Sequence, residues 1–174
     1  MRTFIILILS LLLLSGKLFS QPLDRISSYL DSKYISQVAK DYYNGKFTAT
    51  DDSRTLSILD SVATANHSTR PFYLLLMSRM MKSADGALSE AIGERCKDFV
   101  EQHPNQTISF LFNERGQKFL DSWGKAIAAE LTIDCEDHPK ACSRQSFAIA
   151  MQRVKPTNKK LLEQLYEKVA LHCR

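Results

Sequence analysis

The chain has 174 residues, of which 44% are hydrophobic and 24% charged, and its formal net charge at pH 7 is +4. A chain of this size can form one domain with a proper hydrophobic core. Lys and Arg are scattered among Asp and Glu, and the densest basic pair near the C-terminus is Lys159-Lys160. Nucleic-acid-binding domains concentrate their basic residues on one face, so the sequence predicts no nucleic-acid partner.

Residues 1–20 have the layout of a secretory signal peptide. Met1-Arg2 gives a positive start, Phe4 to Leu14 is an Ile/Leu run broken only by Ser10, and the small residue Ser20 precedes a polar stretch. A cationic start, an apolar core of about 7–15 residues and a small residue at the cut are typical of such peptides. The run is shorter than the roughly 20 apolar residues of a membrane-spanning helix. We expect cleavage after Ser20; the alternative is a retained amphiphilic anchor.

Removal of these 20 residues from 174 leaves a domain of 154 residues, 21–174, and lowers the formal charge from +4 to +2. The first Cys is Cys96, so no Cys follows the predicted cut for the acylation that a bacterial lipoprotein requires. No second apolar segment is long enough to span a membrane. We therefore expect a soluble protein that is secreted or periplasmic.

The mature chain repeats apolar residues every three or four positions, which predicts one helix after another. No run alternates as a strand does. Start signals are Asp51 or Asp52, Thr69-Arg70-Pro71, Ser143 and Pro156-Thr157. The sequence predicts an irregular all-α bundle of about seven helices, with stacked hairpins as one possible arrangement. The apolar stripes run over Leu23 to Tyr42, Leu56 to Val62, Phe72 to Met81, Leu88 to His103, Ile108 to Phe112, Leu120 to Leu131, Phe147 to Val154 and Leu162 to Cys173.

The segment Phe72 to Met81 is apolar nearly all round, with only Ser78 and Arg79 as interruptions. A helix of this kind is normally buried at the centre of a domain. Its Leu and Met side chains could instead line a groove for a lipid, because Met adapts to irregular partners. We expect a core helix, and the hydrophobic-ligand groove is the alternative.

Four Cys in an exported chain predict two disulfides. The favoured pairing joins Cys135 to Cys142 within one loop and Cys96 to Cys173 across the core. The rival pairing joins Cys142 to Cys173, because the last two helices are expected to form an antiparallel hairpin, and leaves Cys96 for Cys135. Each bridge should stabilise the fold by about 2–4 kcal/mol.

The same loop allows a zinc site. Cys135, His138 and Cys142 have the spacing Cys-x2-His-x3-Cys, and His172-Cys173 could supply a fourth ligand. An oxidising compartment favours the disulfide over thiolate ligands. We therefore expect no metal and no cofactor.

No sequence motif for catalysis is present: Gly-x-Ser-x-Gly, His-Glu-x-x-His, Cys-x-x-Cys-His and phosphate-binding Gly-rich loops are all missing. His67 and His103 have no neighbouring partner that suggests a triad. Two carboxylate pairs, Glu90 with Glu94 and Asp134 with Asp137, are the candidates for acid–base chemistry. Asn66-His67-Ser68 and Asn105-Gln106-Thr107 match the N-glycosylation pattern, which matters only in a eukaryotic host.

The leading hypothesis is an exported helical protein that binds another extracytoplasmic protein, as an inhibitor or immunity-type protein does. It rests on a well-formed helical core without a recognisable catalytic group, and the comparison with such proteins is one of size and class. The alternatives are a hydrolase that cleaves envelope or extracellular polymers with a carboxylate pair, and a carrier of a hydrophobic ligand.

Overall fold

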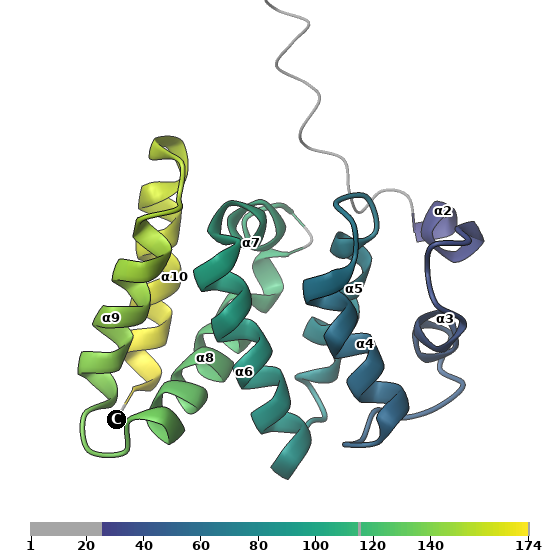
Figure 1. Cartoon of the computed structure of the whole chain (residues 1–174), viewed down its shortest axis with the longest axis horizontal. Helices are drawn as coiled ribbons and strands as arrows, with labels where there is room; N and C mark the ends of the chain where they lie inside the picture. The colour runs from purple at the N-terminus through teal and green to yellow at the C-terminus, as the bar shows by residue number, and fades with distance from the viewer. Residues whose placement is uncertain (1–25, 115, 174) are drawn as a thin grey trace, which may run out of the picture.

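The computed structural model describes residues 26–114 and 116–173 (Figure 1). The predicted signal peptide and its cleavage site lie outside the described residues. Within those ranges every regular element is an α-helix or a 3-10 helix and none is a strand, so the all-α prediction is confirmed. The α-helices are α2 (Ile26–Asp31), α3 (Gln37–Tyr43), α4 (Ser53–Thr64), α5 (Arg70–Met80), α6 (Gly86–Gln102), α7 (Pro104–Leu111), α8 (Leu120–Asp134), α9 (Pro139–Met151) and α10 (Lys159–His172). Two short 3-10 turns, Gln117–Phe119 and Pro156–Asn158, precede α8 and α10.

The helices stand side by side in a row of layers (Figure 1). The short helices α2 and α3 lie at one end, the pair α4 and α5 comes next, α6, α7 and α8 form the middle, and the hairpin of α9 and α10 closes the other end. The α9–α10 hairpin is antiparallel, as its tight turn predicts, because Ser146 near the middle of α9 bonds the Tyr166 hydroxyl at 2.7 Å. Among the described helices, none combines the length and apolar content needed to cross a bilayer.

The first apolar stripe forms two helices where the sequence predicts one. The backbone leaves the helix after Asp31 and returns at Gln37. Two serines explain the break: the Tyr34 N–H donates to Ser32 Oγ at 3.2 Å, and the Ala39 N–H donates to Ser36 Oγ at 3.2 Å. Serine side chains that accept from nearby backbone N–H groups compete with helix continuation and favour a new helix start.

Helix α5 is the core helix predicted from its composition. Every side chain from Phe72 to Ser78 is buried, and Met80 is fully buried. The one hydroxyl inside it, that of Ser78, accepts from Trp123 Nε1 at 2.8 Å and donates to the Leu74 carbonyl at 2.8 Å. The apolar side chains of α5 therefore contact the protein's own core.

Two predicted helix starts are confirmed and a third is wrong. Thr69 is the N-cap residue of α5, and Pro71 lies in its first turn. Asp52 caps α4, with its carboxylate accepting from the Thr55 N–H at 2.9 Å. Ser143 was expected to cap the penultimate helix but lies buried inside it, because α9 begins four residues earlier at Pro139. Proline is well suited to the first helical position, where its missing N–H has no intrahelical role.

One side chain connects the middle of the molecule to its C-terminal hairpin. The Asn105 side-chain amide, in the first turn of α7, donates to the Arg153 carbonyl at 3.0 Å. Its oxygen accepts from the Lys155 N–H at 2.8 Å and from Asn158 Nδ2 at 3.1 Å. Asn105 thus forms hydrogen bonds with polar groups of the turn between α9 and α10, which lie 48 to 53 residues later in the sequence.

Candidate functional site

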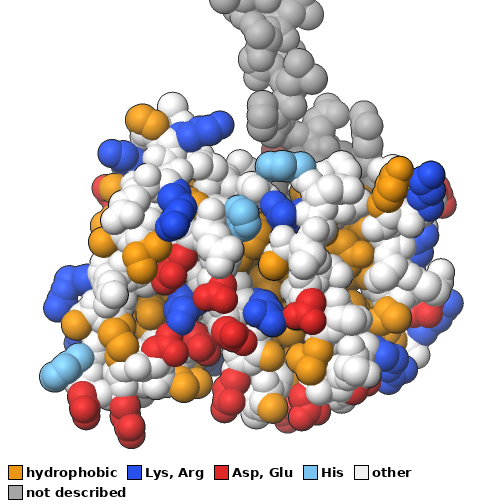
Figure 2. Space-filling model, viewed as in Figure 1, with side chains coloured by type: hydrophobic (Ala, Val, Ile, Leu, Met, Phe, Trp, Pro, Cys, Tyr) orange, Lys and Arg blue, Asp and Glu red, His pale blue; other side chains and the backbone are white. Residues whose placement is uncertain are grey.

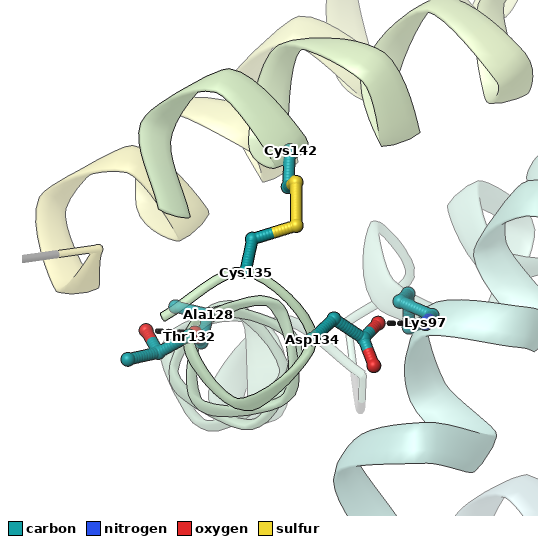
Figure 3. The surroundings of a disulfide bond; sticks show 6 residues. All are labelled: Lys97, Ala128, Thr132, Asp134, Cys135 and Cys142. Atoms are coloured by element: carbon teal, nitrogen blue, oxygen red, sulfur yellow. Dashed lines mark hydrogen bonds and ion pairs between the residues drawn. A yellow bond between two sulfur atoms is a disulfide. The ribbon is translucent and has the colours of Figure 1, made fainter. Parts of the chain in front are cut away.

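The predicted bridge between Cys135 and Cys142 is present (Figure 3). It joins Cys135, the C-cap residue of α8, to the first turn of α9, and the two Cα atoms lie 6.4 Å apart, inside the usual range for a disulfide. The bond fixes the direction in which α9 leaves α8. It also excludes the rival pairing, which needs both of these Cys for other partners.

The second predicted bridge is not formed. Cys96 and Cys173 are free thiols, and both are buried. Burial raises the pKa of the Cys96 thiol well above its ordinary value. Burial also raises the pKa of Cys173, while a hydrogen bond with Ser143 and the charge of Lys140 act in the opposite direction. Cys173 therefore contacts α9, whereas Cys96 belongs to α6. Both thiols are buried in the apolar core, but they are not bonded to each other.

The residues of the alternative zinc site do not converge as ligands. Cys135 and Cys142 are bonded to each other, His138 is exposed, and His172 Nε2 lies 3.3 Å from the Asp121 carboxylate on α8. Among the described residues, no group of three His, Cys, Asp or Glu side chains is placed to hold a metal ion.

The predicted carboxylate pairs are not placed as pairs for acid–base chemistry. Glu90 and Glu94 are exposed on the outer side of α6. Helix α8 ends at Asp134, so Asp137 lies in the following loop and not one helical turn further along the same face. Glu94 and Asp134 belong instead to a different group of carboxylates.

Four carboxylates and one ammonium meet where α6 packs on α8. We call this group the acidic face, and its members are Glu94, Lys97 and Asp98 from α6 and Glu130 and Asp134 from α8. Figure 2 shows the acidic side chains gathered over α6 and its contact with α8. The chain as a whole carries a formal charge of +4, so this face has the opposite sign to the whole chain.

Glu130 is the buried member of the acidic face. Only 9% of its surface is exposed, and in the described part of the chain it forms no hydrogen bond and no ion pair. Burial raises the pKa of Glu130, and repulsion from Asp134 raises it further, while Lys97 acts in the opposite direction. A carboxylate that is taken out of water without a direct partner is destabilising in its charged form.

The glycine opposite Glu130 allows the two helices to lie this close. A Cβ atom on Gly93 of α6 would lie 3.0 Å from the Ala126 carbonyl oxygen and 3.3 Å from the Glu130 Cβ. The backbone of α6 therefore covers the stem of the Glu130 side chain. The carboxylate oxygen Oε2 would lie 3.4 Å from the same Cβ atom, so α6 also covers part of the carboxyl group.

Lys97 and Asp134 form an ion pair across the same helix contact (Figure 3). Burial by itself would lower the pKa of Lys97, but the hydrogen bond with Asp134 and the charges of Asp134, Glu130 and Asp98 raise it overall. The Lys97 side chain is 18% exposed and that of Asp134 is 39% exposed. Lys97 and Arg95, whose Nη1 lies 3.9 Å from the Glu94 carboxylate, are the two cations beside these four carboxylates, so the face keeps an excess of negative charge.

The position of Glu130 in the sequence indicates that it lies on the buried side of its helix, although the apolar stripes alone do not include it. Glu130 follows Trp123 by seven residues and Ile127 by three, so it lies on the same helical side as the buried residues of α8. An acidic residue at such a position is rarely buried without a partner. Its surroundings, however, come from α6, more than 30 residues earlier.

Comparisons with protein-family models, with curated proteins and with solved structures find no match for this chain.

Proposed function

We propose that the protein binds another protein outside the cytoplasm, and that the acidic face on α6 and α8 is the binding surface. The observation that carries the proposal is Glu130, a residue only 9% exposed whose carboxylate forms no hydrogen bond or ion pair within the described residues, in a negative surface on a positively charged chain. The partner would present Lys or Arg side chains to this face. A guanidinium group from the partner would supply the charge-assisted hydrogen bonds that Glu130 lacks.

The surface is suited to recognition because it is held in one geometry. Its side chains stand on two packed helices, and the disulfide of Cys135 holds the end of α8. A rigid surface loses little conformational entropy on binding. Ile133, on the last turn of α8 next to Asp134, is 59% exposed and offers an apolar contact beside the charges.

A capture experiment with matched variants tests the proposal. The exported protein is immobilised and exposed to extracytoplasmic extracts of its own host and of competing organisms, and bound proteins are eluted with salt. The variant Asp98→Asn/Glu130→Gln removes two charges from the acidic face. The control Glu163→Gln/Glu167→Gln removes two exposed charges from α10.

We expect a bound protein with a basic surface that the control retains and the face variant loses. Truncation of one partner in a buried charged pair costs about 2–5 kcal/mol of binding free energy, so the loss of affinity should exceed about tenfold. Equal retention of the same proteins by both variants would refute the role of this face.

The carboxylate-pair hydrolase remains the second candidate, with a different pair of residues. Glu130 has a raised pKa, as a general acid requires, and Asp134, one turn further on, is held by Lys97. If this pair is catalytic, Glu130→Gln should abolish release of reducing ends or peptides from envelope polymers. Substrate binding should then persist in Glu130→Gln, which is the opposite of the result expected for a binding surface.

A further inference from the structure

A second charged cluster lies where the α4–α5 turn faces the junction of α6 and α7. Three side chains that can carry positive charge contribute to it: His67 from the turn, Arg70 from the start of α5, and His103 between α6 and α7. Burial lowers the pKa of His103, and the charges of Arg70 and His67 lower it further. Figure 2 shows histidine and basic side chains together on this part of the surface, between α5 and α7.

Arg70 has only neutral partners. Its Nη1 donates to Gln106 Oε1 at 2.9 Å and its Nη2 donates to the Ala63 carbonyl at 3.0 Å. Its Nε is buried and has no hydrogen-bond partner. No carboxylate in the described ranges forms an ion pair with it, whereas Arg54 and Arg95 each pair with an aspartate at 2.9 Å.

An aromatic ring lies beneath the cluster. The Phe99 ring centroid lies 5.9 Å from the Arg70 Cζ atom and 5.0 Å from the centroid of the His103 ring. The ring keeps water from one side of both groups. Charge–charge interactions are stronger in such a partly desolvated place than in bulk water.

A half-buried guanidinium without an anion carries a desolvation cost that an anionic ligand would offset. The imidazole rings of His67 and His103 lie beside it and add further N–H donors. Arginine matches the oxygens of a phosphate group with parallel N–H donors. We propose that His67, Arg70 and His103 form a binding site for a phosphate group, on a soluble phosphorylated molecule or on a lipid headgroup.

The first test is a titration of the full exported protein with inorganic phosphate, followed through the imidazole signals of His67 and His103 by NMR. We expect saturable shifts of both signals. Arg70→Gln should weaken binding by about tenfold or more, the size expected for loss of a charge-assisted hydrogen bond. The matched control is Arg79→Gln, which removes the same charge from the other end of α5, where Arg79 lies over the Tyr43 ring; its affinity should stay within about twofold.

The proposal fails if phosphate produces no saturable shift beyond that of sodium chloride at equal ionic strength, or if Arg70→Gln and Arg79→Gln weaken binding equally. Arg70→Gln also removes the bonds to Gln106 and Ala63, so its fold is checked by circular dichroism. His67→Gln provides a second variant, since His67 is exposed and forms no hydrogen bond within the described residues. It should weaken phosphate binding without altering the unfolding midpoint.

Sulfate isolates the contribution of the histidines, because it keeps its double charge throughout the range in which imidazole titrates. His103 is faced by Arg70 and His67, so an anion placed between them favours the protonated ring. Sulfate affinity should rise several-fold as the pH falls from about 8 to about 5, and less so in His67→Gln. An affinity that is independent of pH would contradict the involvement of the histidines.

A vesicle-binding experiment distinguishes the two possible sources of the phosphate group. Vesicles of phosphatidylglycerol in phosphatidylcholine are sedimented with the wild-type protein, Arg70→Gln and Arg79→Gln. Binding that only Arg70→Gln loses assigns the site to a lipid headgroup. Binding of inorganic phosphate without sedimentation assigns it to a soluble phosphorylated molecule, and vesicle binding equal in all three proteins contradicts the site.

Discussion

Helix α8 packs against α6 on one side and α10 on the other, and each contact is close because of a glycine. A Cβ atom on Gly124 would lie 2.7 Å from the Lys168 Cβ and 3.1 Å from the Lys168 carbonyl carbon. A Cβ atom on Gly93, at the α6 side, would meet the Ala126 carbonyl oxygen at 3.0 Å. In both contacts a glycine therefore allows the two helices to pack closely, and the approach is slightly closer at Gly124 than at Gly93.

The two contacts differ in the residues that form them. Toward α10, the buried residues Leu162, Leu165 and Val169 form an apolar seam. Toward α6, the seam ends in the buried carboxylate of Glu130 and the Lys97–Asp134 ion pair. A buried pair or an unpaired charge contributes little to stability or lowers it, so we expect the α6 contact to stabilise the fold less than the α10 contact does.

The largest effect should come from the bridge that fastens the C-terminal hairpin to α8. Cys135→Ser/Cys142→Ser removes a crosslink with a sequence separation of 7, and loop-closure entropy gives a loss of about 2 kcal/mol. The unfolding midpoint, measured by calorimetry without reductant, should fall by about 4–8 °C.

A thiol count provides the control for this first prediction. Alkylation of the wild type should label no Cys in the native state, and should label Cys96 and Cys173 after denaturation without reductant, since both are buried and free. An unchanged midpoint in the double serine variant would show that packing alone holds the hairpin.

The two glycines provide a matched pair of intermediate size. Gly124→Ala places a Cβ atom against the α10 backbone, and should destabilise the protein by about 1–2 kcal/mol in urea unfolding, after the gain in helix propensity. Gly93→Ala meets a less severe contact and should change stability by less than about 1 kcal/mol. A larger loss of stability in Gly93→Ala than in Gly124→Ala would mean that the α6 contact stabilises the fold more than the α10 contact does.

The smallest effect should be a gain in stability from Glu130→Gln. The folded state raises the pKa of Glu130 above its ordinary value, so the folded protein binds more protons there than the unfolded chain. Wild-type stability is therefore lost as the pH rises from the ordinary pKa of 4.5 through the raised folded-state value. Glutamine does not ionise, so the variant should be more stable at pH 7, by less than about 1 kcal/mol, and the advantage should vanish near pH 4.

Urea unfolding of wild type and Glu130→Gln across this pH range checks the sign. The exposed control Glu163→Gln should change stability at pH 7 by less than about 0.5 kcal/mol. A destabilising effect of Glu130→Gln at pH 7 would mean that the ionised carboxylate has a favourable partner within the protein.

The sequence predicted the parts of the fold that depend on neighbouring residues. The helical spacing of apolar residues predicted the all-α class, the short separation of Cys135 and Cys142 predicted their bridge, and the turn at Pro156 predicted the final hairpin. All three are present in the structure. The break between α2 and α3 was missed because local serine hydrogen bonds outweigh a continuous apolar stripe.

The candidate sites were beyond prediction from sequence because they depend on partners far along the chain. The burial of Glu130 depends on Gly93, 37 positions earlier. Arg70 reaches Gln106, 36 positions later. Spacing rules relate residues within a few helical turns, and they do not determine which helix will cover a given side chain. The same reasoning predicts a bridge between Cys96 and Cys173, which are free thiols in the structure.

The Asn105 contact has a consequence for biosynthesis. Asn105 begins an Asn-Gln-Thr sequence of the kind that oligosaccharyltransferases modify, and the nitrogen that would receive the sugar donates to the Arg153 carbonyl. In a host with this machinery, the sugar can be attached only while the C-terminal hairpin is still unfolded or still being translated. A sugar on Asn105 would then show that the enzyme acted before the C-terminal hairpin folded. A sugar on Asn66, which is exposed in its turn, would not show when it was attached.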